Sequence, residues 1–207
     1  MNMSELLKKL ETYADSDYLP MHMPGHKRRM GDLGNPFFID ITEIDGFDDL
    51  HHAEGILKQA EERAAELYGS EETHYLVNGS TSGILAAISG CTAAGGTILL
   101  ARNSHKSAYH AVLLRGLHVH YIYPQPAGKM GINGPVTAEN VDRLLEEHPE
   151  TKMVYITSPT YDGVVSDVEQ IAEVVHRRKL PLIVDEAHGA HSVSYTHLRA
   201  HETRGNL

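Results

Sequence analysis

The segment 180–191 constrains the fold more than any other part of this sequence. A short apolar run begins at Leu180 and ends abruptly at Asp185. Such a run is typical of a buried strand in an α/β sheet, and its end lies at the sheet edge where these proteins bind ligands. Because a buried carboxylate needs a compensating partner, we predict that Asp185 pairs with a cation or a protonated ring nitrogen.

Three other interpretations of this segment remain open. Asp185-Glu186-Ala187-His188 is also the Walker B signature of one helicase class, but the sequence has no Gly-x-x-x-x-Gly-Lys-Ser/Thr run to hold the phosphates. His188 and His191 would be metal ligands in a second interpretation, although no further cluster has a recognised zinc spacing, and we expect no metal centre. In the third, the segment is a purely structural strand end.

Composition excludes several classes of protein. The 207 residues suffice for one substantial core, and 41% hydrophobic with 22% charged residues is ordinary for a globular domain. A net charge of −10 argues against a nucleic-acid partner, and no apolar stretch is long enough to cross a membrane. We expect a cytoplasmic protein, because the N-terminus has no signal-peptide pattern and the single Cys91 fits a reducing compartment.

The first third of the sequence is mostly irregular. Ser4 and the leucines at 6, 7 and 10 predict a short amphipathic helix, which makes residues 1–19 an N-terminal arm. Residues 20–34 hold prolines, glycines and a basic run at 26–29, typical of a solvated linker or of a loop that brings cations to an anionic site. The acidic segment 40–49 is also irregular, and residues 54–68 predict a helix that stops at Gly69.

From residue 73 onward, strand-like and helix-like segments alternate with short connections. This alternation is typical of an α/β fold with a doubly wound, mostly parallel sheet. The expected strands are 73–77, 97–101, 118–123, 153–157 and 182–184, and the expected helices are 81–91, 105–115, 138–148 and 168–179.

Residues 78–83, Asn-Gly-Ser-Thr-Ser-Gly, join an expected strand to an expected helix. The helix dipole, free backbone N–H groups and the hydroxyls of Ser80, Thr81 and Ser82 would face one sheet edge, which suits a phosphate. A Ser/Thr helix cap with turn glycines explains this segment equally well. Asp185 on the same sheet favours the phosphate interpretation.

His105 follows the strand expected at 97–101, where its imidazole would lie against a planar cofactor. Because the chain has 15 histidines, His105 alone is more often a helix cap or a surface residue. Residues 157–163 form a further loop at a strand end. A phosphate site, a stacking imidazole and a carboxylate for a ring nitrogen are what pyridoxal phosphate requires.

Six runs of residues resemble the major domain of the ornithine/lysine/arginine decarboxylase family, within the fold type I pyridoxal-phosphate enzymes. The resemblance implies a fold type I aminotransferase-like sheet that is incomplete at its C-terminus, with residues 20–191 forming a partial pyridoxal-phosphate-binding major domain. The runs are Met-Pro-Gly-His at 23–26, Asp-Ile-Thr-Glu at 40–43 with Gly-Phe-Asp-Asp-Leu-His at 46–51, Asn-Gly-Ser-Thr-Ser at 78–82, Arg-Asn-Ser-His-Lys-Ser at 102–107, Pro-Thr-Tyr-Asp-Gly at 159–163 and Asp-Glu-Ala-His-Gly-Ala-His at 185–191.

The resemblance also implies an activity. The full-length protein would remove the α-carboxylate of arginine, lysine or ornithine and give agmatine, cadaverine or putrescine. It would be a homodimer or a larger homo-oligomer, with the loop at 24–26 near a neighbour's pocket. Ser80 and Thr81 would hold the cofactor phosphate with Ser82 close by, His105 would stack on the ring, Asp185 would bind its nitrogen, and Ala187 and His188 would line the pocket.

The sequence departs from the family pattern near its end. The family's Schiff-base lysine lies downstream of the Asp-Glu-Ala-His strand, yet the chain has no lysine after Lys179, and Lys106 belongs to the stacking motif. We therefore expect the chain alone to be inactive. Residues 192–207 lack a strand or helix period and resemble translated sequencing-adaptor read-through, which predicts a non-native tail.

Two other functions remain open. One is another fold type I activity, an aminotransferase or a carbon–sulfur lyase, which would use the same phosphate site and the same Asp185. The other is a catalytically inactive remnant that binds the cofactor.

Overall fold

The computed structural model describes residues 3–20, 34–128 and 131–190 of the chain. Two compact units are formed, Met1–Asp49 and Leu50–Leu207. The expected loop motif at 23–26, the basic run at 26–29, His191 and the predicted non-native tail at 192–207 lie outside the described residues. Within the described ranges, no helix combines the length and the apolar character needed to cross a bilayer.

The first unit holds helix α1 (Met3–Ala14) and a short 3-10 helix η2 (Pro36–Phe38). The leucine spacing predicted α1, whereas η2 was not predicted. The Asn35 side chain caps η2 by accepting a hydrogen bond from the Phe37 N–H at 3.0 Å. Residues 40–49 are irregular, as the sequence predicts.

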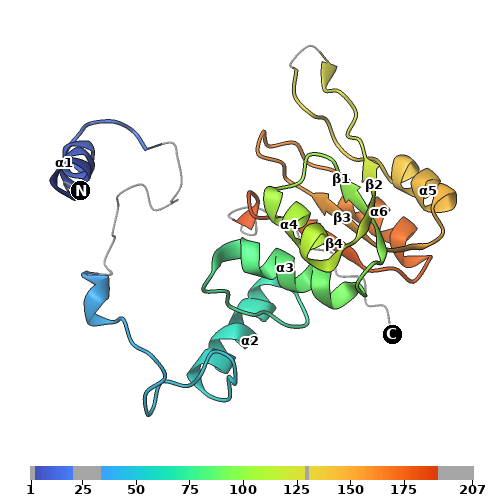
Figure 1. Cartoon of the computed structure of the whole chain (residues 1–207). Coiled ribbons are helices and arrows are strands. Elements are labelled where there is room, and N and C mark those ends of the chain that lie inside the picture. The colour runs from blue at the N-terminus through green and yellow to red at the C-terminus, as the bar shows by residue number, and fades with distance from the viewer. Residues whose placement is uncertain (1–2, 21–33, 129–130, 191–207) are drawn as a thin grey trace. The chain divides into compact units, whose positions relative to one another are not determined.

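The second unit is built on a parallel sheet (Figure 1). Among the described residues the sheet has four strands in the order β2-β1-β3-β4, and every neighbouring pair is parallel. The central β1 and β3 are buried along most of their length, because strands covered on both faces are apolar almost throughout. The strands are β1 (Thr97–Ala101), β2 (His118–Ile122), β3 (Thr151–Thr157) and β4 (Leu182–Asp185).

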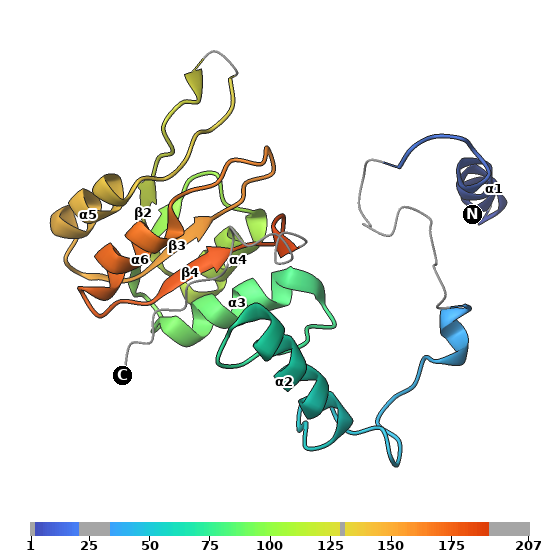
Figure 2. The ribbon, with the colours of Figure 1, turned by 180° about the vertical axis from the view of Figure 1, so that it is seen from behind.

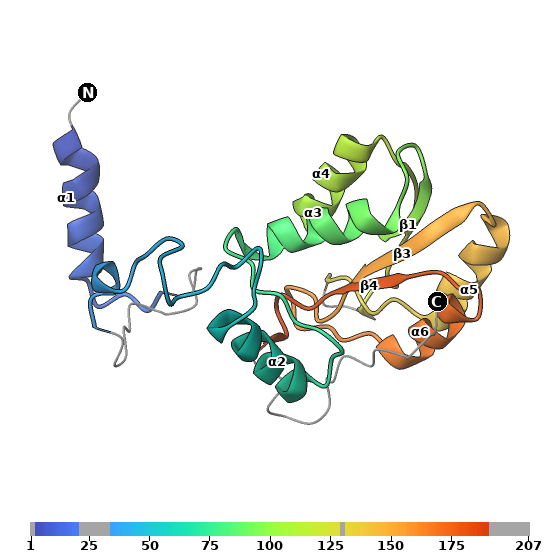
Figure 3. The same ribbon diagram turned by 90° about the horizontal axis from the view of Figure 1, so that it is seen from below.

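Helices cover both faces of this sheet (Figure 3). Helices α3 (Gly79–Cys91) and α4 (Lys106–Arg115) pack on one face through a core that includes Ile88, Leu100 and Tyr155. Helices α5 (Ala138–Glu147) and α6 (Val168–His176) pack on the other face, in a core that includes Val141, Val154 and Ile171. The predicted doubly wound α/β fold is confirmed.

Of the elements expected in the described ranges, one prediction is wrong, because residues 73–77 do not form a strand. Tyr75 and Val77 are 44% and 75% exposed, and no described strand pairs with this segment. Tyr75 instead bonds toward α2 (Ile56–Tyr68), with its N–H donating to Glu61 Oε1 at 3.2 Å and its hydroxyl to the Ala60 carbonyl at 3.1 Å. Alternating apolar residues form a strand only where a neighbour supplies backbone partners.

The other expected elements are present, with ends that differ by at most three residues. Seen from behind, β4 lies at an edge of the described sheet (Figure 2). Its last residue is Asp185, one position beyond the expected strand.

Candidate active site

The carboxyl ends of the parallel strands define one edge of the sheet. Thr157 and Asp185 end β3 and β4 and are register partners. Ala101, the last residue of β1, pairs with Ile122 at the end of β2. In α/β proteins ligands bind at this edge, because the helices that follow the strands begin there.

Asp185 is held in a fixed orientation at this edge. It is buried, and the Tyr155 hydroxyl donates to its Oδ2 at 3.0 Å while the Ala187 N–H donates to its Oδ1 at 3.1 Å. Burial, and then the negative charge of Asp185, raises the pKa of Tyr155, so the phenol keeps its proton and remains a donor. A carboxylate with two donors still has acceptor capacity for a cationic partner.

Tyr155 lies outside the six runs that carry the family resemblance. Tyr155 is fully buried in β3, and its register partner on β4 is Ile183. A phenol among the apolar residues of a buried strand needs a hydrogen-bond partner, and this feature of the sequence could have drawn attention to Tyr155. The identity of that partner depends on the pairing of two strands 30 residues apart in sequence.

The first turn of α3 carries Ser80 and Thr81, both exposed. The helix begins after Asn78, which makes no side-chain cap, and Gly79 has a φ of +67° that favours glycine. The cap by Ser80 or Thr81 is therefore not formed, and the turn presents its N–H groups and the Ser80 hydroxyl as an anion site would. The Ser82 hydroxyl donates to the Gly79 carbonyl at 2.9 Å, so its proton is used within the turn.

Ser107 connects this turn to His105. The Ser107 side chain is buried, with its Oγ 3.0 Å from Thr81 Oγ1 and 2.6 Å from His105 Nδ1. The Ser107 N–H donates to the same Nδ1 at 3.3 Å, which makes His105 the N-cap of α4. With Nδ1 as acceptor, the neutral ring carries its proton on Nε2, and the Ser107 hydroxyl donates to His105 and accepts from Thr81.

His105 is therefore a helix cap, which is one of the two roles that the sequence suggested for it. Its side chain is nevertheless exposed next to the end of β1, with one ring nitrogen fixed by Ser107. The structure thus joins Thr81 and His105, two predicted cofactor residues, through a residue to which the sequence analysis gave no role.

The loops after β3 and β4 meet at the same edge. The exposed Tyr161 and His188 rings lie edge to face with centroids 5.5 Å apart. A Cβ on Gly189 would come within 2.6 Å of Pro159 Cδ, so the close approach of these loops requires glycine. Ala187 is exposed, and burial raises the pKa of the neighbouring Glu186 carboxyl.

Two buried polar atoms near this edge have no hydrogen-bond partner among the described residues, Asn103 Oδ1 and Thr157 Oγ1. Asn103 follows β1 and Thr157 ends β3. Because buried polar atoms are normally paired, these two fit polar groups of a bound molecule. With the uncapped start of α3 and the oriented Asp185, they suit a phosphorylated ring with a protonated nitrogen, and pyridoxal phosphate is such a group.

A cavity of about 400 Å³ lies beside the first turn of α3, where Asn78 and Ser82 line it together with Glu61 and His74. Neither His105 nor Asp185 lines this cavity. Of the predicted cofactor residues, Ser82 therefore lies at this cavity, whereas His105 and Asp185 lie at the carboxyl ends of β1 and β4, with α3 packed against β4.

Comparison with known proteins gives a consistent result. Residues 4–203 match the family model of the Orn/Lys/Arg decarboxylase major domain. The chain is 40% identical to the uncharacterized protein YaaO of Bacillus subtilis, covering 91% of this chain and 41% of that protein. It is 36% identical to the arginine decarboxylase of B. subtilis, covering 88% of this chain and 39% of that enzyme. The chain thus spans about two fifths of the length of these curated relatives.

Solved structures support the same fold. The constitutive lysine decarboxylase of Escherichia coli matches with a TM-score of 0.58 at 23% identity, covering 86% of this chain and 28% of that one. N-succinyldiaminopimelate aminotransferase of Mycobacterium tuberculosis matches with a TM-score of 0.50 at 25% identity, covering 63% of this chain and 35% of that one. The predicted fold type I aminotransferase-like architecture is confirmed. The chain belongs to the Orn/Lys/Arg decarboxylase family, with residues 4–203 matching the model of the family's major domain.

Proposed function

We propose that the full-length protein is a pyridoxal-phosphate-dependent decarboxylase of a basic amino acid. The family match supports this reaction class, and the observation that carries it is the buried Asp185 carboxylate, oriented by two donors at the carboxyl edge of the sheet. When bound, pyridoxal phosphate supplies the electron sink for the electron pair that the departing carboxylate leaves behind.

Different residues bind the phosphate of the cofactor, its ring face and its ring nitrogen. The first turn of α3 binds the phosphate through its backbone N–H groups and the Ser80 hydroxyl, and Thr81 contributes its N–H because its hydroxyl proton is donated to Ser107. His105, held by Ser107, lies against the ring face and fixes its plane. Asp185 keeps the ring nitrogen protonated, because a carboxylate within contact distance favours the charged form of its partner. Ala187 and His188, both exposed after β4, would line the cofactor site there.

Arginine is the first substrate to assay. Four relatives named arginine decarboxylase are 34–36% identical to this chain. A lysine decarboxylase and an ornithine decarboxylase are 26% and 24% identical, and the biodegradative arginine decarboxylase of Escherichia coli is 23% identical. The expected product is agmatine, with cadaverine and putrescine as the products of the other two amino acids.

The proposal includes a homo-oligomer in the cytoplasm. Leu113 and Leu114 on α4 are 78% and 73% exposed, and adjoining apolar side chains on a surface are typical of contacts with a partner. The single cysteine agrees with a reducing compartment. Light scattering on the full-length protein would measure the assembly.

The test is the substitution Asp185→Asn in the full-length protein, which keeps the shape of the side chain and removes its charge. We expect CO₂ release from arginine, lysine and ornithine to fall by at least about 100-fold, the effect of losing one preorganised electrostatic partner. The matched control is Asp17→Asn, at an exposed aspartate outside the six runs that carry the family resemblance. Turnover of Asp185→Asn within a few-fold of the parent, with unchanged circular dichroism, would refute the role.

An aminotransferase activity is the second candidate, because one of the structural relatives has that activity. The same preparation should be assayed with an α-keto acid. Amino-group transfer without CO₂ release would favour this alternative over the decarboxylase.

A further inference from the structure

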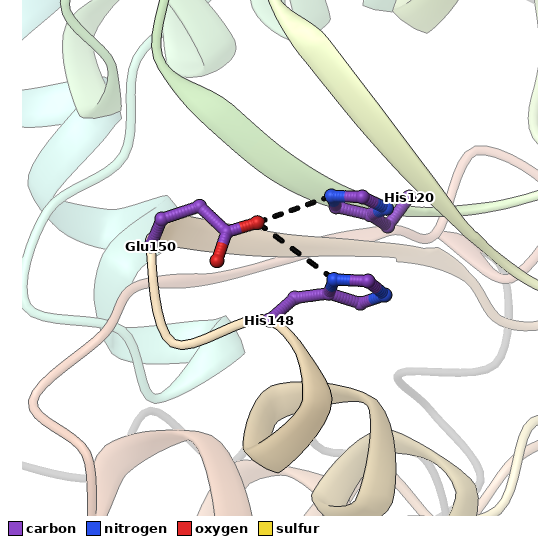
Figure 4. Close-up of side chains that lie close together, drawn as sticks. All are labelled: His120, His148 and Glu150. Atoms are coloured by element: carbon purple, nitrogen blue, oxygen red, sulfur yellow. Dashed lines mark hydrogen bonds and ion pairs between the residues drawn. The ribbon is translucent and has the colours of Figure 1, made fainter.

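A second cluster of chemically active side chains lies away from the carboxyl edge of the sheet (Figure 4). It consists of His120 in β2, His148 at the C-terminal end of α5 and Glu150 directly before β3. Glu150 is at the amino end of β3, whereas Thr157 is at its carboxyl end. At about 3.3 Å per residue the two ends are roughly 20 Å apart, so this cluster is distinct from the candidate active site.

The ligand atoms of the three side chains already converge. Glu150 Oε1 is 3.1 Å from His120 Nε2 and 3.7 Å from His148 Nδ1. One ligand atom from each residue lies within 4.8 Å of the other two. The two imidazoles stack with centroids 3.4 Å apart and planes 8° from parallel.

The fold explains why these residues meet. His120 is two positions before Ile122, and both therefore face the side of the sheet that α5 covers. The turn from α5 into β3 then carries His148 and Glu150 past β2. A hydrogen bond from its own backbone lowers the pKa of Glu150 and desolvation opposes this change, while the hydrogen bond from His120 and the charges of His148 and His120 lower the pKa further.

We propose that His120, His148 and Glu150 form a binding site for a divalent transition-metal ion, with Zn²⁺ as the best fit. Two imidazoles and one carboxylate are a ligand set that zinc uses, and such sites leave the fourth position to water. The side chains are 36%, 27% and 50% exposed, so an ion reaches them from solvent without disturbing the core.

Binding requires a defined rearrangement. A metal ion lies in the plane of each imidazole that binds it, and two stacked rings have parallel planes. One ring must therefore turn about its side-chain torsions until the three ligand atoms surround the ion. With bonds of about 2.0–2.1 Å in tetrahedral geometry, neighbouring ligand atoms come to about 3.3 Å from one another.

The site would join β2 to the α5–β3 connection. An ion that binds the folded chain and not the unfolded chain stabilises the fold in proportion to its occupancy. Zn²⁺ should therefore raise the unfolding temperature. Neither the ligands nor this readout depend on the proposed decarboxylase activity.

The experiment is titration of the full chain, without a histidine tag, with ZnCl₂ by isothermal titration calorimetry. Glutamine replaces His120, His148 and Glu150 singly, and His110→Gln is the matched control because His110 is an exposed histidine on α4. We expect a saturable step of one ion per chain, weakened at least about tenfold by each of the three substitutions and unchanged in the control. The chain has 15 histidines, so weak binding common to all variants is background.

Absence of a saturable step in the parent would overturn the proposal, as would equal affinity in the three variants and the control. If a variant fails to fold, nuclear magnetic resonance of the parent decides. Zn²⁺ should shift the imidazole signals of His120 and His148 before those of His110. Shifts that appear together at all histidines would also overturn the site.

Discussion

The two helical layers of the second unit differ in how completely their helices are stabilised. On one face, the N-termini of α5 and α6 are capped by Thr137 and Asp167, whose side chains accept backbone hydrogen bonds at 3.3 and 3.0 Å. Asp142 on α5 forms ion pairs with Arg177 and Arg178 at the end of α6. On the other face, α3 has no charged residue between Gly79 and Cys91 and no side-chain cap.

This difference suggests that one helical layer mainly stabilises the fold and the other mainly binds the cofactor. A side-chain cap occupies one of the free N–H donors of a first turn and places its own oxygen there, so a capped N-terminus is less suited to an anion than an uncapped one. Helix α3 keeps those donors, and the His105 cap of α4 also fixes an exposed imidazole at the sheet edge. The α5/α6 layer is therefore built mainly for packing, and the α3/α4 layer carries the residues that we assign to the cofactor.

The largest expected effect tests the packing layer. Ile171 on α6 is fully buried, and Ile171→Ala should lower the free energy of unfolding by about 2–5 kcal/mol through lost packing and a new cavity. Urea unfolding measures this change. Leu67→Ala on α2 is the control, since Leu67 is 72% exposed and should change stability by no more than about 0.5 kcal/mol. Equal losses at both positions would break the comparison.

The next effect tests the binding layer. Ser80→Ala should weaken pyridoxal phosphate binding to the full-length protein by about 1.5–3 kcal/mol, roughly 10- to 150-fold in Kd, because a hydrogen bond to a charged phosphate is lost. Ser82→Ala should weaken it less, since the Ser82 proton is donated to the Gly79 carbonyl. Cofactor titration followed by absorbance measures both. Unchanged affinity in Ser80→Ala would leave this turn as an ordinary helix start.

A smaller effect concerns the support of Asp185. Tyr155→Phe removes the donor to Oδ2 and should lower the free energy of unfolding by about 1–3 kcal/mol, because a buried acceptor loses its partner. It should also reduce turnover of the full-length protein. Tyr68→Phe on α2 is the control, at a tyrosine that is 40% exposed and away from the carboxyl edge of the sheet. A Tyr155→Phe protein as stable and active as this control would show that Ala187 alone orients the carboxylate.

The smallest effect depends on pH. Burial raises the pKa of Glu186 in the folded chain, so its contribution to stability is present below the ordinary glutamate pKa of about 4.3 and is lost as pH rises through the raised value. Glu186→Gln should therefore raise the unfolding temperature at pH 7 and lose this advantage toward pH 4. Thermal unfolding across that range, with exposed Glu173→Gln as control, measures it. A destabilised variant at pH 7 would contradict this assignment.

Local periodicity predicted most of the second unit, because the spacing of apolar residues within a short segment indicates an amphipathic helix or a buried strand. It failed at 73–77, where a strand needs a partner that local sequence does not specify. The site was predictable in part for the same reason. Ser80, Thr81, His105 and Asp185 each lie in a recognisable local motif, whereas the contacts of Tyr155 with Asp185 and of Ser107 with Thr81 depend on register and helix packing.

The position of Ser107 between Thr81 and His105 has a consequence for protein engineering. Its one hydroxyl contacts both a residue assigned to the phosphate and a residue assigned to the ring, so neither can be redesigned independently. Residues that share a hydrogen-bond network show non-additive free energies on double substitution. Attempts to change cofactor affinity or ring geometry should therefore mutate Thr81, His105 and Ser107 at the same time, in one combinatorial library.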